Sequence, residues 1–228
     1  MYRKTLLTLT IVLCVTLGYA LSTVAVELGG EAEDATIEAP MVVATPSEAA
    51  AQGGPEPVDA SGGKFVWSPG PPVTGGGDEG FIEFAINIPA AGTYAVWGRV
   101  VAWDGNSDSY WVNWLPADAD ENSQETGNTE FRWGVAGGNE WHWDRINHWL
   151  DSGTFEREWE LPAGETTLKI YTREDATMLD CIYITDNLSE DEAEVAPKLP
   201  TEGVDPLWTA VEAQGKLATT WANMKETH

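Results

Sequence analysis

Histidine is scarce in this chain of 228 residues, which contains only His142, His148 and His228. The sequence also lacks a Gly-x-Ser-x-Gly nucleophile motif, a His-Glu-x-x-His zinc motif and a glycine-rich phosphate loop. These absences argue against serine hydrolases, zinc proteases and enzymes that bind nucleotides through such a loop. We therefore expect a protein that is not an enzyme.

Basic side chains are also few. The chain has 12 Lys and Arg against 37 Asp and Glu, which gives a formal net charge of −25 and a sequence pI of about 4.1. This charge repels nucleic acid and anionic lipid surfaces, and we expect no nucleic-acid partner. A neutral or cationic partner, or a hard divalent cation, is compatible with it.

Cysteine is nearly absent. The chain has two, and one of them, Cys14, lies in the apolar N-terminal segment. Met-Tyr-Arg-Lys followed by an apolar stretch is typical of a secretory signal peptide, here residues 1–25. Cleavage after Ala25 is preferred over cleavage after Ala20, and either would remove Cys14 and leave Cys181 without an internal disulfide partner. We expect a secreted, extracellular or cell-surface protein, with a membrane contact only if the signal stays uncleaved.

Short strand-like runs recur between turn signals, with no helical period between them. They lie at residues 64–67, 81–88, 93–102, 108–114, 129–133, 141–146, 155–161, 166–172 and 178–185. This spacing predicts an all-β antiparallel jelly-roll β-sandwich over residues 26–186, with long loops at 44–63 and 68–80. Residues 187–204 are expected to be an acidic, proline-containing linker, and 205–228 a short C-terminal helical tail that begins at Asp205-Pro206.

Tryptophan is present in excess. Ten of the twelve tryptophans lie between Trp67 and Trp159, interspersed with polar residues. A single tryptophan usually packs in a core, but this number predicts that some indole faces stay exposed as platforms for a flat, half-polar ligand such as a sugar ring. Strand alternation gives the face candidates Trp97, Arg99, Trp111, Asn113, Trp141 and Trp143.

Three carboxylates are candidates for a metal site. We expect Glu31 and Glu33 to lie on one side of a first strand, and Asp180 lies in the last strand of the sandwich, which can be its neighbour. Together with backbone carbonyls from Ser61 to Lys64, they would form an oxygen-only cage, which selects Ca²⁺. A structural calcium ion would tie the two ends of the sandwich together in place of a disulfide.

Five short motifs follow one another along the chain. They are residues 31–34 (Glu-Ala-Glu-Asp), 60–66 (Ala-Ser-Gly-Gly-Lys-Phe-Val), 91–100 (Ala-Gly-Thr-Tyr-Ala-Val-Trp-Gly-Arg-Val), 161–170 (Leu-Pro-Ala-Gly-Glu-Thr-Thr-Leu-Lys-Ile) and 179–180 (Leu-Asp). In this order they resemble the carbohydrate-binding modules of families 6 and 35. The resemblance implies a galactose-binding-like β-sandwich over about residues 31–186, with the structural calcium on Glu31, Glu33, Asp180 and a carbonyl of the turn that ends at Lys64.

The same resemblance implies a sugar site among the loops at one end of the sandwich. The stacking aromatic of that site falls on Trp103, and its neighbours Asp104 and Asn106 would bind sugar hydroxyls. An asparagine often stands just before the last strand in these modules, whereas this chain has Met178. The identity of the sugar does not follow from the sequence.

We therefore predict a secreted, non-catalytic protein that binds an oligo- or polysaccharide through exposed tryptophans on a calcium-stabilised sandwich. One alternative is a structural or adhesive surface protein that binds another protein and uses its tryptophans as core. A second is a glycan-active hydrolase, because carboxylate pairs such as Glu140 with Asp144, or Glu156 with Glu158, occur in so acidic a chain.

Overall fold

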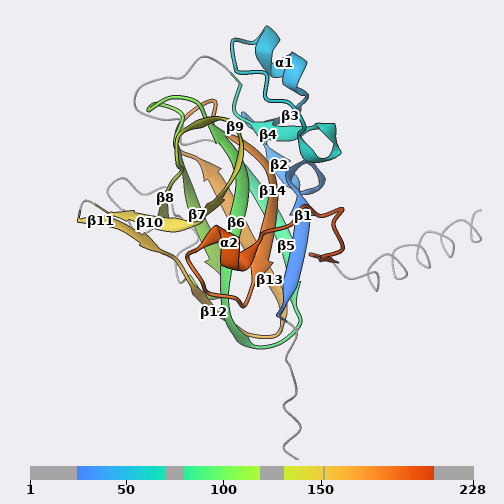
Figure 1. The fold of residues 1–228 in the computed structure, drawn as a ribbon, viewed down its shortest axis with the longest axis vertical. Coiled ribbons are helices and arrows are strands. Elements are labelled where there is room, and N and C mark those ends of the chain that lie inside the picture. Colours follow the sequence, from blue (N-terminus) through green and yellow to red (C-terminus); the bar gives the residue numbers. More distant parts are fainter. Residues whose placement is uncertain (1–24, 70–79, 119–130, 151, 208–228) are drawn as a thin grey trace, which may run out of the picture.

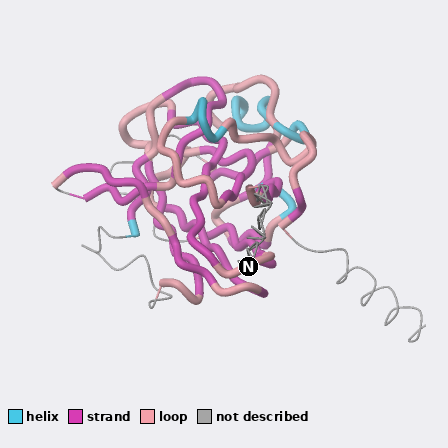
Figure 2. The backbone as a smooth tube through the Cα atoms, turned by 60° about the horizontal axis from the view of Figure 1, so that its bottom comes forward, coloured by secondary structure: helices cyan, strands magenta, loops and turns pink. Residues whose placement is uncertain are grey.

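Two β-sheets pack face to face in the computed structural model, which describes residues 25–69, 80–118, 131–150 and 152–207 (Figure 1). Strands dominate the described residues, and the few helices are short (Figure 2). The all-β sandwich predicted from the sequence is confirmed.

The larger sheet has eight strands. They are β1 (Glu27–Glu31), β3 (Val42–Ala44), β4 (Phe65–Trp67), β6 (Gly92–Ala102), β9 (Gly138–Arg145), β12 (Trp159–Leu161), β14 (Met178–Thr185) and β15 (Asp205–Pro206). At its centre, β14 pairs antiparallel with β1, β4 and β6. β6 also pairs with β9 and β12, and β1 pairs in parallel with β15. The first and last strands of the sandwich are therefore neighbours.

The second sheet has five strands in the order β2-β5-β13-β7-β8. Their bounds are β2 (Thr36–Glu38), β5 (Phe81–Ile88), β7 (Ser109–Leu115), β8 (Arg132–Gly134) and β13 (Gly164–Thr172). A separate hairpin, β10 (Asn147–Leu150) and β11 (Gly153–Glu156), projects from the edge near β8 (Figure 1). This hairpin contributes to the candidate site described below.

Hydrophobic alternation placed the long strands well. β5 and β14 have the predicted bounds, and the predicted runs at 93–102 and 166–172 differ from β6 and β13 by no more than two residues. The predicted strand at 155–161 is wrong as one element. It divides into β11 and β12, because buried Arg157 and exposed Glu158 leave the sheet between them.

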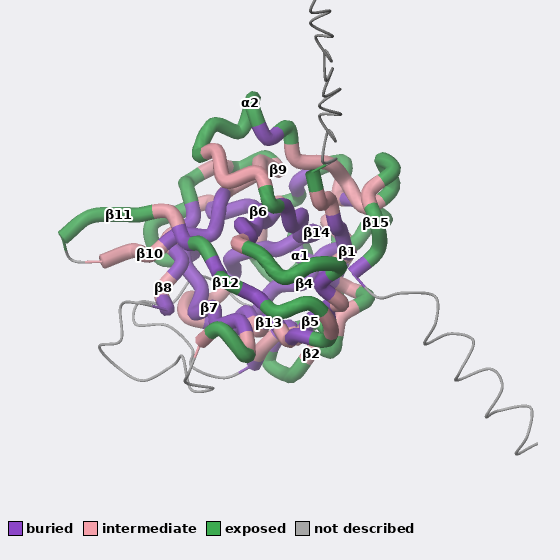
Figure 3. Tube along the Cα trace, turned by 90° about the horizontal axis from the view of Figure 1, so that it is seen from below, coloured by how far each residue is buried: buried purple, intermediate pink, exposed green. Residues whose placement is uncertain are grey.

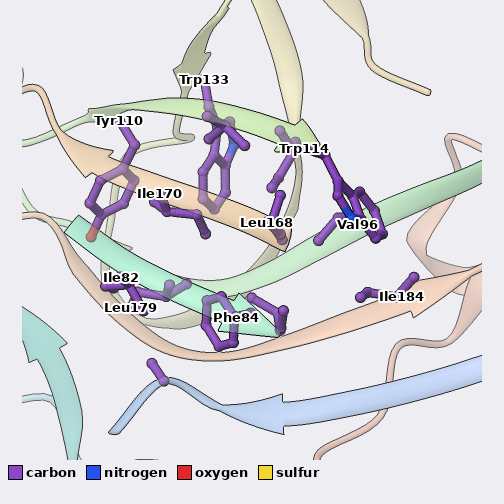
Figure 4. Close-up of a cluster of buried hydrophobic side chains, with 14 of the residues drawn as sticks. Ile82, Phe84, Val96, Tyr110, Trp114, Trp133, Leu168, Ile170, Leu179 and Ile184 are labelled. Atoms are coloured by element: carbon purple, nitrogen blue, oxygen red, sulfur yellow. The ribbon is translucent and has the colours of Figure 1, made fainter. Parts of the chain in front are cut away.

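The main core lies between the two sheets (Figure 4). Alternate residues of β5 and β13 face alternate residues of β6 and β14, so that aromatic and branched side chains fill the space. Trp114 and Trp133 are fully buried there, and the ring of Trp133 lies 5.5 Å from that of Tyr110. Several of the ten central tryptophans therefore serve as core.

The segment predicted as a loop at 44–63 contains a short helix, α1 (Pro46–Ala51). Thr45 caps it, since its hydroxyl accepts a hydrogen bond from the backbone N–H of Glu48 while the Glu48 carboxylate accepts one from the backbone N–H of Thr45. A second small cluster lies at this end of the larger sheet, and its fully buried aromatic residues are Phe65 and Trp67.

Residues 187–207 pack on the sandwich instead of forming a free linker. Within them α2 (Glu192–Val195) lies over β6 (Figure 1), and most of the trace around α2 is coloured as exposed in Figure 3. Val195 at its end is buried. Asp205-Pro206, predicted to open a helix, forms β15 instead, and Leu207 is fully buried beside it. The backbone carbonyl of Leu207 accepts a hydrogen bond from Asn87 N–H at 2.9 Å.

The expected signal peptide falls almost entirely outside the described residues, as does any helix after Leu207. Among the residues that the structure does describe, no helix is long and apolar enough to cross a membrane. Cys181 is buried and forms no disulfide.

We predict that Gly98→Ala destabilises the fold by about 1–3 kcal/mol, the usual cost of overpacking a core. An added Cβ at Gly98 would lie 2.4 Å from Cη2 of Trp133 and 3.2 Å from Cδ1 of Leu179. Urea unfolding followed by tryptophan fluorescence measures the change.

Gly92→Ala is the matched control, because it lies on the same strand and its added Cβ would meet nothing closer than the Tyr94 ring at 3.6 Å. Equal stability of Gly98→Ala and Gly92→Ala would show that the ring of Trp133 does not constrain β6.

Candidate functional site

The three predicted metal ligands converge on the turn formed by residues 61–63. Asp180 Oδ1 accepts a hydrogen bond from the backbone N–H of Ser61 at 2.8 Å, and Glu31 Oε1 accepts one from the Ser61 hydroxyl at 2.6 Å. Gly62 has a φ of 62°, and an added Cβ there would lie 2.8 Å from Glu33 Oε1. Glycine is thus required both by the backbone and by the close approach of Glu33.

These acids are partly or fully buried and have few positive partners. Glu31 Oε2 and Glu33 Oε2 are buried and accept no hydrogen bond. Burial is the main cause that raises the pKa of Glu33 to about 7 and that of Asp180 to about 6, and it also raises the pKa of Glu31. Arg99 supplies one cation, with Nη1 2.5 Å from Asp180 Oδ2.

The predicted strand alternation is not what brings Glu31 and Glu33 together. Glu31 ends β1, but Glu33 lies in a 3₁₀ turn, Ala32–Asp34. The chain turns at Ala32, which is fully buried, and this turn directs both carboxylates toward residues 61–63. Lys64 closes that turn, and its side chain is exposed.

Within the described ranges, no three His, Cys, Asp or Glu side chains already have the arrangement of a metal site. The donor chemistry nevertheless fits a hard cation, because the acids present only oxygen and two of those oxygens are buried without a partner. Asp180 can accept its two hydrogen bonds and still offer a lone pair to an ion.

The predicted tryptophan face on the larger sheet exists but is largely covered. Pairing of β6 with β9 places Arg99 beside Trp143, and Arg99 also lies 5.7 Å from the ring centre of Trp141. Trp97, however, is only 3% exposed and packs with Tyr183 and Val195. Val195 belongs to residues 187–204, which were predicted to be a linker.

Trp111 and Asn113 do not join this face. They lie on β7 of the other sheet and are 8% and 0% exposed. Arg173 covers Trp111, with its guanidinium carbon 5.4 Å from the ring centre. Their predicted role as an exposed platform is therefore wrong, as is that of Trp97.

Trp103 follows β6 in the loop that leads to β7. Its ring is half-buried against the cluster around Phe65 and Met178, and its Nε1 is buried without a hydrogen-bond partner. The neighbouring Asp104 and Asn106 are exposed, and Asp104 Oδ1 accepts a hydrogen bond from the backbone N–H of Asn106 at 2.7 Å. This loop keeps the predicted polar groups accessible beside a partly exposed indole.

A cleft that the sequence did not predict opens near the end of the same loop. Its volume is about 300 Å³, and the side chains of Asp108, Asp144, Asn147, Trp149 and Thr154 line it together with backbone from residues 134–136. The cleft thus combines a half-buried indole with two carboxyl groups and an amide, that is, an aromatic surface beside a few polar groups, as in many small-molecule sites.

Hydrogen bonds hold the walls of the cleft in place. Asn147 binds the backbone of Gly134 through both of its side-chain polar atoms, at 3.1 and 2.8 Å, which ties β10 to β8. Arg132 fixes Trp149, since its Nε donates to the Trp149 carbonyl at 2.7 Å and its guanidinium lies 4.1 Å from the ring centre. The indole is therefore preorganised.

The two carboxyl groups of the cleft have different environments. Asp144 accepts hydrogen bonds from Trp133 Nε1 at 2.7 Å and from the backbone N–H of Ala136 at 2.9 Å, and burial raises its pKa. Asp108 Oδ1 is buried and receives no hydrogen bond from a side-chain or backbone N–H or O–H group. Burial, and after it the neighbouring carboxyl group of Glu174, raise the pKa of Asp108 to about 7.

The cleft could not be predicted from the sequence because its residues come from five separate places, namely the β6–β7 loop, residues 134–136 at and after the end of β8, β9, β10 and β11. No spacing along the chain links them. The one available signal was Trp149 itself, which follows a polar residue, His148, in a region rich in tryptophan.

Comparison with family models finds no match, and no curated protein matches the chain. Solved structures with a similar fold include a family 35 carbohydrate-binding module from Clostridium thermocellum, with 15% identity, a TM-score of 0.44, and coverage of 71% of this chain and 98% of that one. Another is the C-terminal family 6 module of LamC, a marine laminarinase from Zobellia galactanivorans (17% identity, TM-score 0.45, coverage 70% and 98%).

A third is the family 35 module from Paenibacillus barcinonensis, with 19% identity, a TM-score of 0.45, and coverage of 68% of this chain and 96% of that one. Both families named by the sequence resemblance are thus represented among these structures. At these identities and TM-scores, the function is inferred from the residues of the site and not from these structures.

We predict that Asp144→Ala lowers the free energy of unfolding by about 1–3 kcal/mol, because the indole N–H of the fully buried Trp133 loses its acceptor, whereas the N–H of exposed Ala136 can bond to water. Asp144→Asn should cost less, since the amide oxygen can still accept one of the two bonds. Chemical denaturation of both variants tests this.

Glu140→Gln is the control, an exposed acid on the same strand. A loss in Glu140→Gln as large as that in Asp144→Ala would contradict a specific role for the hydrogen bonds of Asp144.

Proposed function

We propose that this chain is a secreted, non-catalytic carbohydrate-binding protein that holds a glycan at the loop end of its sandwich. The observation that carries the proposal is the cleft of about 300 Å³ beside Trp149. An indole face buries the apolar side of a sugar ring, while carboxylates and an amide bind its hydroxyl groups.

The β6–β7 loop supports a second point of contact. It begins at the half-buried Trp103, presents Asp104 and Asn106 to solvent and ends at the cleft residue Asp108. A glycan chain of several units would contact this loop as well as the cleft. Two stacking contacts correspond to binding in the micromolar to millimolar range.

We favour the cleft over the face of the larger sheet as the glycan site, because the β10–β11 hairpin helps to form the cleft while residues 187–207 cover that face. Trp97 is covered, whereas Trp149 lines an open cleft. A protein-binding role would need a continuous apolar patch. Among the described residues the large exposed hydrophobic side chains are few: Val42, Val43, Val58 and Phe155.

We further propose that calcium stabilises the fold at the cluster of Glu31, Glu33 and Asp180, together with a carbonyl oxygen of the turn that ends at Lys64. The partnerless oxygens of Glu31 and Glu33 support this site. When bound, the ion would neutralise the acids of β1, of the 3₁₀ turn Ala32–Asp34 and of β14, and a carbonyl oxygen would tie them to residues 61–64. The ion would thus link the N-terminal strand, the turn at residues 61–63 and β14. These three segments are distant in sequence, so the ion would act as a staple.

For glycan binding, we predict that Trp149→Ala weakens the affinity for the recognised glycan by about 2 kcal/mol, roughly thirtyfold, as removal of an aromatic anchor does. Trp103→Ala should weaken binding of longer oligosaccharides, with little loss of stability. A glycan array identifies the ligand, and calorimetry then measures both variants.

Phe155→Ala is the matched control, since Phe155 is 54% exposed on the same hairpin as Trp149 and does not line the cleft. Wild-type affinity in Trp149→Ala, on every glycan that the array identifies, would refute the cleft as the binding site.

For calcium, we predict that chelation lowers the melting temperature of the wild type. An ion present at about 100 times its Kd contributes about 2.7 kcal/mol, which corresponds to roughly 5–10 °C in a domain of this size. Asp180→Ala should melt lower and lose the response to calcium. Differential scanning calorimetry with calcium and with chelator measures both effects.

Glu33→Gln separates ion binding from the other bonds of the cluster, because Glu33 Oε2 has no hydrogen-bond partner to lose. It should fold and fail to respond to calcium. A wild-type melting temperature that is the same with chelator and with calcium would exclude the structural ion.

A further inference from the structure

The cleft beside Trp149 has an unbalanced charge. Among the described residues that line it, Asp108 and Asp144 are acidic and none is basic. The whole chain adds to this field, with a formal net charge of −25. A ligand that enters the cleft therefore meets a negative potential that nothing in its lining offsets.

The two acids differ in what they can still bind. Each oxygen of Asp144 already accepts a short hydrogen bond from the protein, from Trp133 Nε1 or from the backbone of Ala136. Asp108 Oδ1 accepts none from any N–H or O–H donor, although it is buried. Asp108 is therefore the less committed of the two acids, and its Oδ1 can accept a donor or pair with a cation.

Asp108 also lies beside a second acid. Its backbone N–H donates to Glu174 Oε2 at 3.1 Å, and the side chains of the two residues interact. Arg173 provides one positive charge, 2.6 Å from Glu174 Oε1, while Asp104 adds a further negative charge near Asp108. Two carboxyl groups next to one guanidinium retain a proton, and a cationic group of a ligand can replace that proton.

The nearest basic side chains are already committed to the protein. Arg173 donates to the Ser109 hydroxyl and to Glu174, and Arg132 donates to the Trp149 carbonyl while it stacks on the indole. The ring of His142 lies between two backbone carbonyl oxygens, with Nδ1 3.0 Å from that of Glu140 and Nε2 2.9 Å from that of Ala136. These bonds leave the acids to determine which ligands the cleft prefers.

We propose that the sugar unit bound in this cleft carries a free amine, as a hexosamine does. The ammonium group would pair with Asp108 and the pyranose ring would lie against Trp149. This inference rests on the proposed glycan binding and names its ligand class. An N-acetylated sugar lacks the charge, and a uronic acid would bring a further anion to the two acids.

The test uses three trisaccharides of similar size: β-1,4-linked glucosamine, its N-acetylated form and a galacturonic acid trimer. Titration calorimetry on the full chain near neutral pH should give at least a tenfold preference for the glucosamine trimer over the acetylated one. Asp108→Asn should remove most of that preference. Its amide can still donate to Glu174, so the local structure is preserved.

Two controls distinguish a site from general attraction between an acidic protein and a cationic sugar. Glu140→Gln removes an exposed negative charge on β9 and should leave the affinity within about twofold of wild type. Calorimetry in buffers with different ionisation enthalpies should show protons released when the wild type binds the glucosamine trimer, and fewer released by Asp108→Asn.

Equal affinity for the amine and acetylated trimers, a preference for the galacturonic acid trimer, or equal losses in Asp108→Asn and Glu140→Gln would overturn the inference. In each of these cases the proposed glycan binding would stand, provided that Trp149→Ala still weakens it. If the glycan array finds no ligand of any class, then the proposed function itself fails.

Discussion

The antiparallel pairing of β14 with β6 and β1 is the interaction on which the rest of the structure depends. β14 is buried along its whole length and pairs with strands that are far apart in the chain, so it joins the beginning, the middle and the end of the sandwich. Asp180 is held within this strand and reaches the turn at residues 61–63. A buried strand that carries an acid needs compensation nearby, and Arg99 on the adjacent strand provides part of it.

The tryptophans serve two purposes that the structure separates by position. Between the sheets, Trp114 and Trp133 fill the core. The indole N–H of Trp114 donates to the Thr166 hydroxyl and that of Trp133 to Asp144, so both buried donors are hydrogen-bonded. Near the β10–β11 hairpin, Trp149 lines the cleft, and the guanidinium groups of Arg132 and Arg173 lie 4.1 and 5.4 Å from its ring centre. The tryptophans between the sheets thus serve as core, whereas Trp149 lies at the surface of the sandwich.

Much of the fold could be predicted from the sequence, because apolar and polar residues alternate in strands such as Phe81–Ile88, and the apolar positions show which face of the strand packs on the core. The same logic could not say which tryptophans stay exposed. By strand alternation Trp97 points away from the core between the sheets, yet Val195 covers it. Val195 lies in an acidic segment whose sequence has no regular apolar pattern, so the contact could not be foreseen. The cleft escaped prediction for a related reason: Asp108, Asp144 and Trp149 come together only through tertiary contacts between edges, where sequence spacing carries no information.

The packing of residues 187–207 has a practical consequence for where the folded unit ends. A chain that ended at Asp186 would still contain strands β1 to β14. It would lack β15, which pairs with β1, and the buried Leu207, and it would expose Trp97 and Tyr183 to water. Such a fragment would expose a hydrophobic surface next to an unpaired strand edge, and this combination promotes self-association. Residues 187–207 are therefore an integral part of the folded domain, and their removal would expose apolar side chains together with the edge of β1.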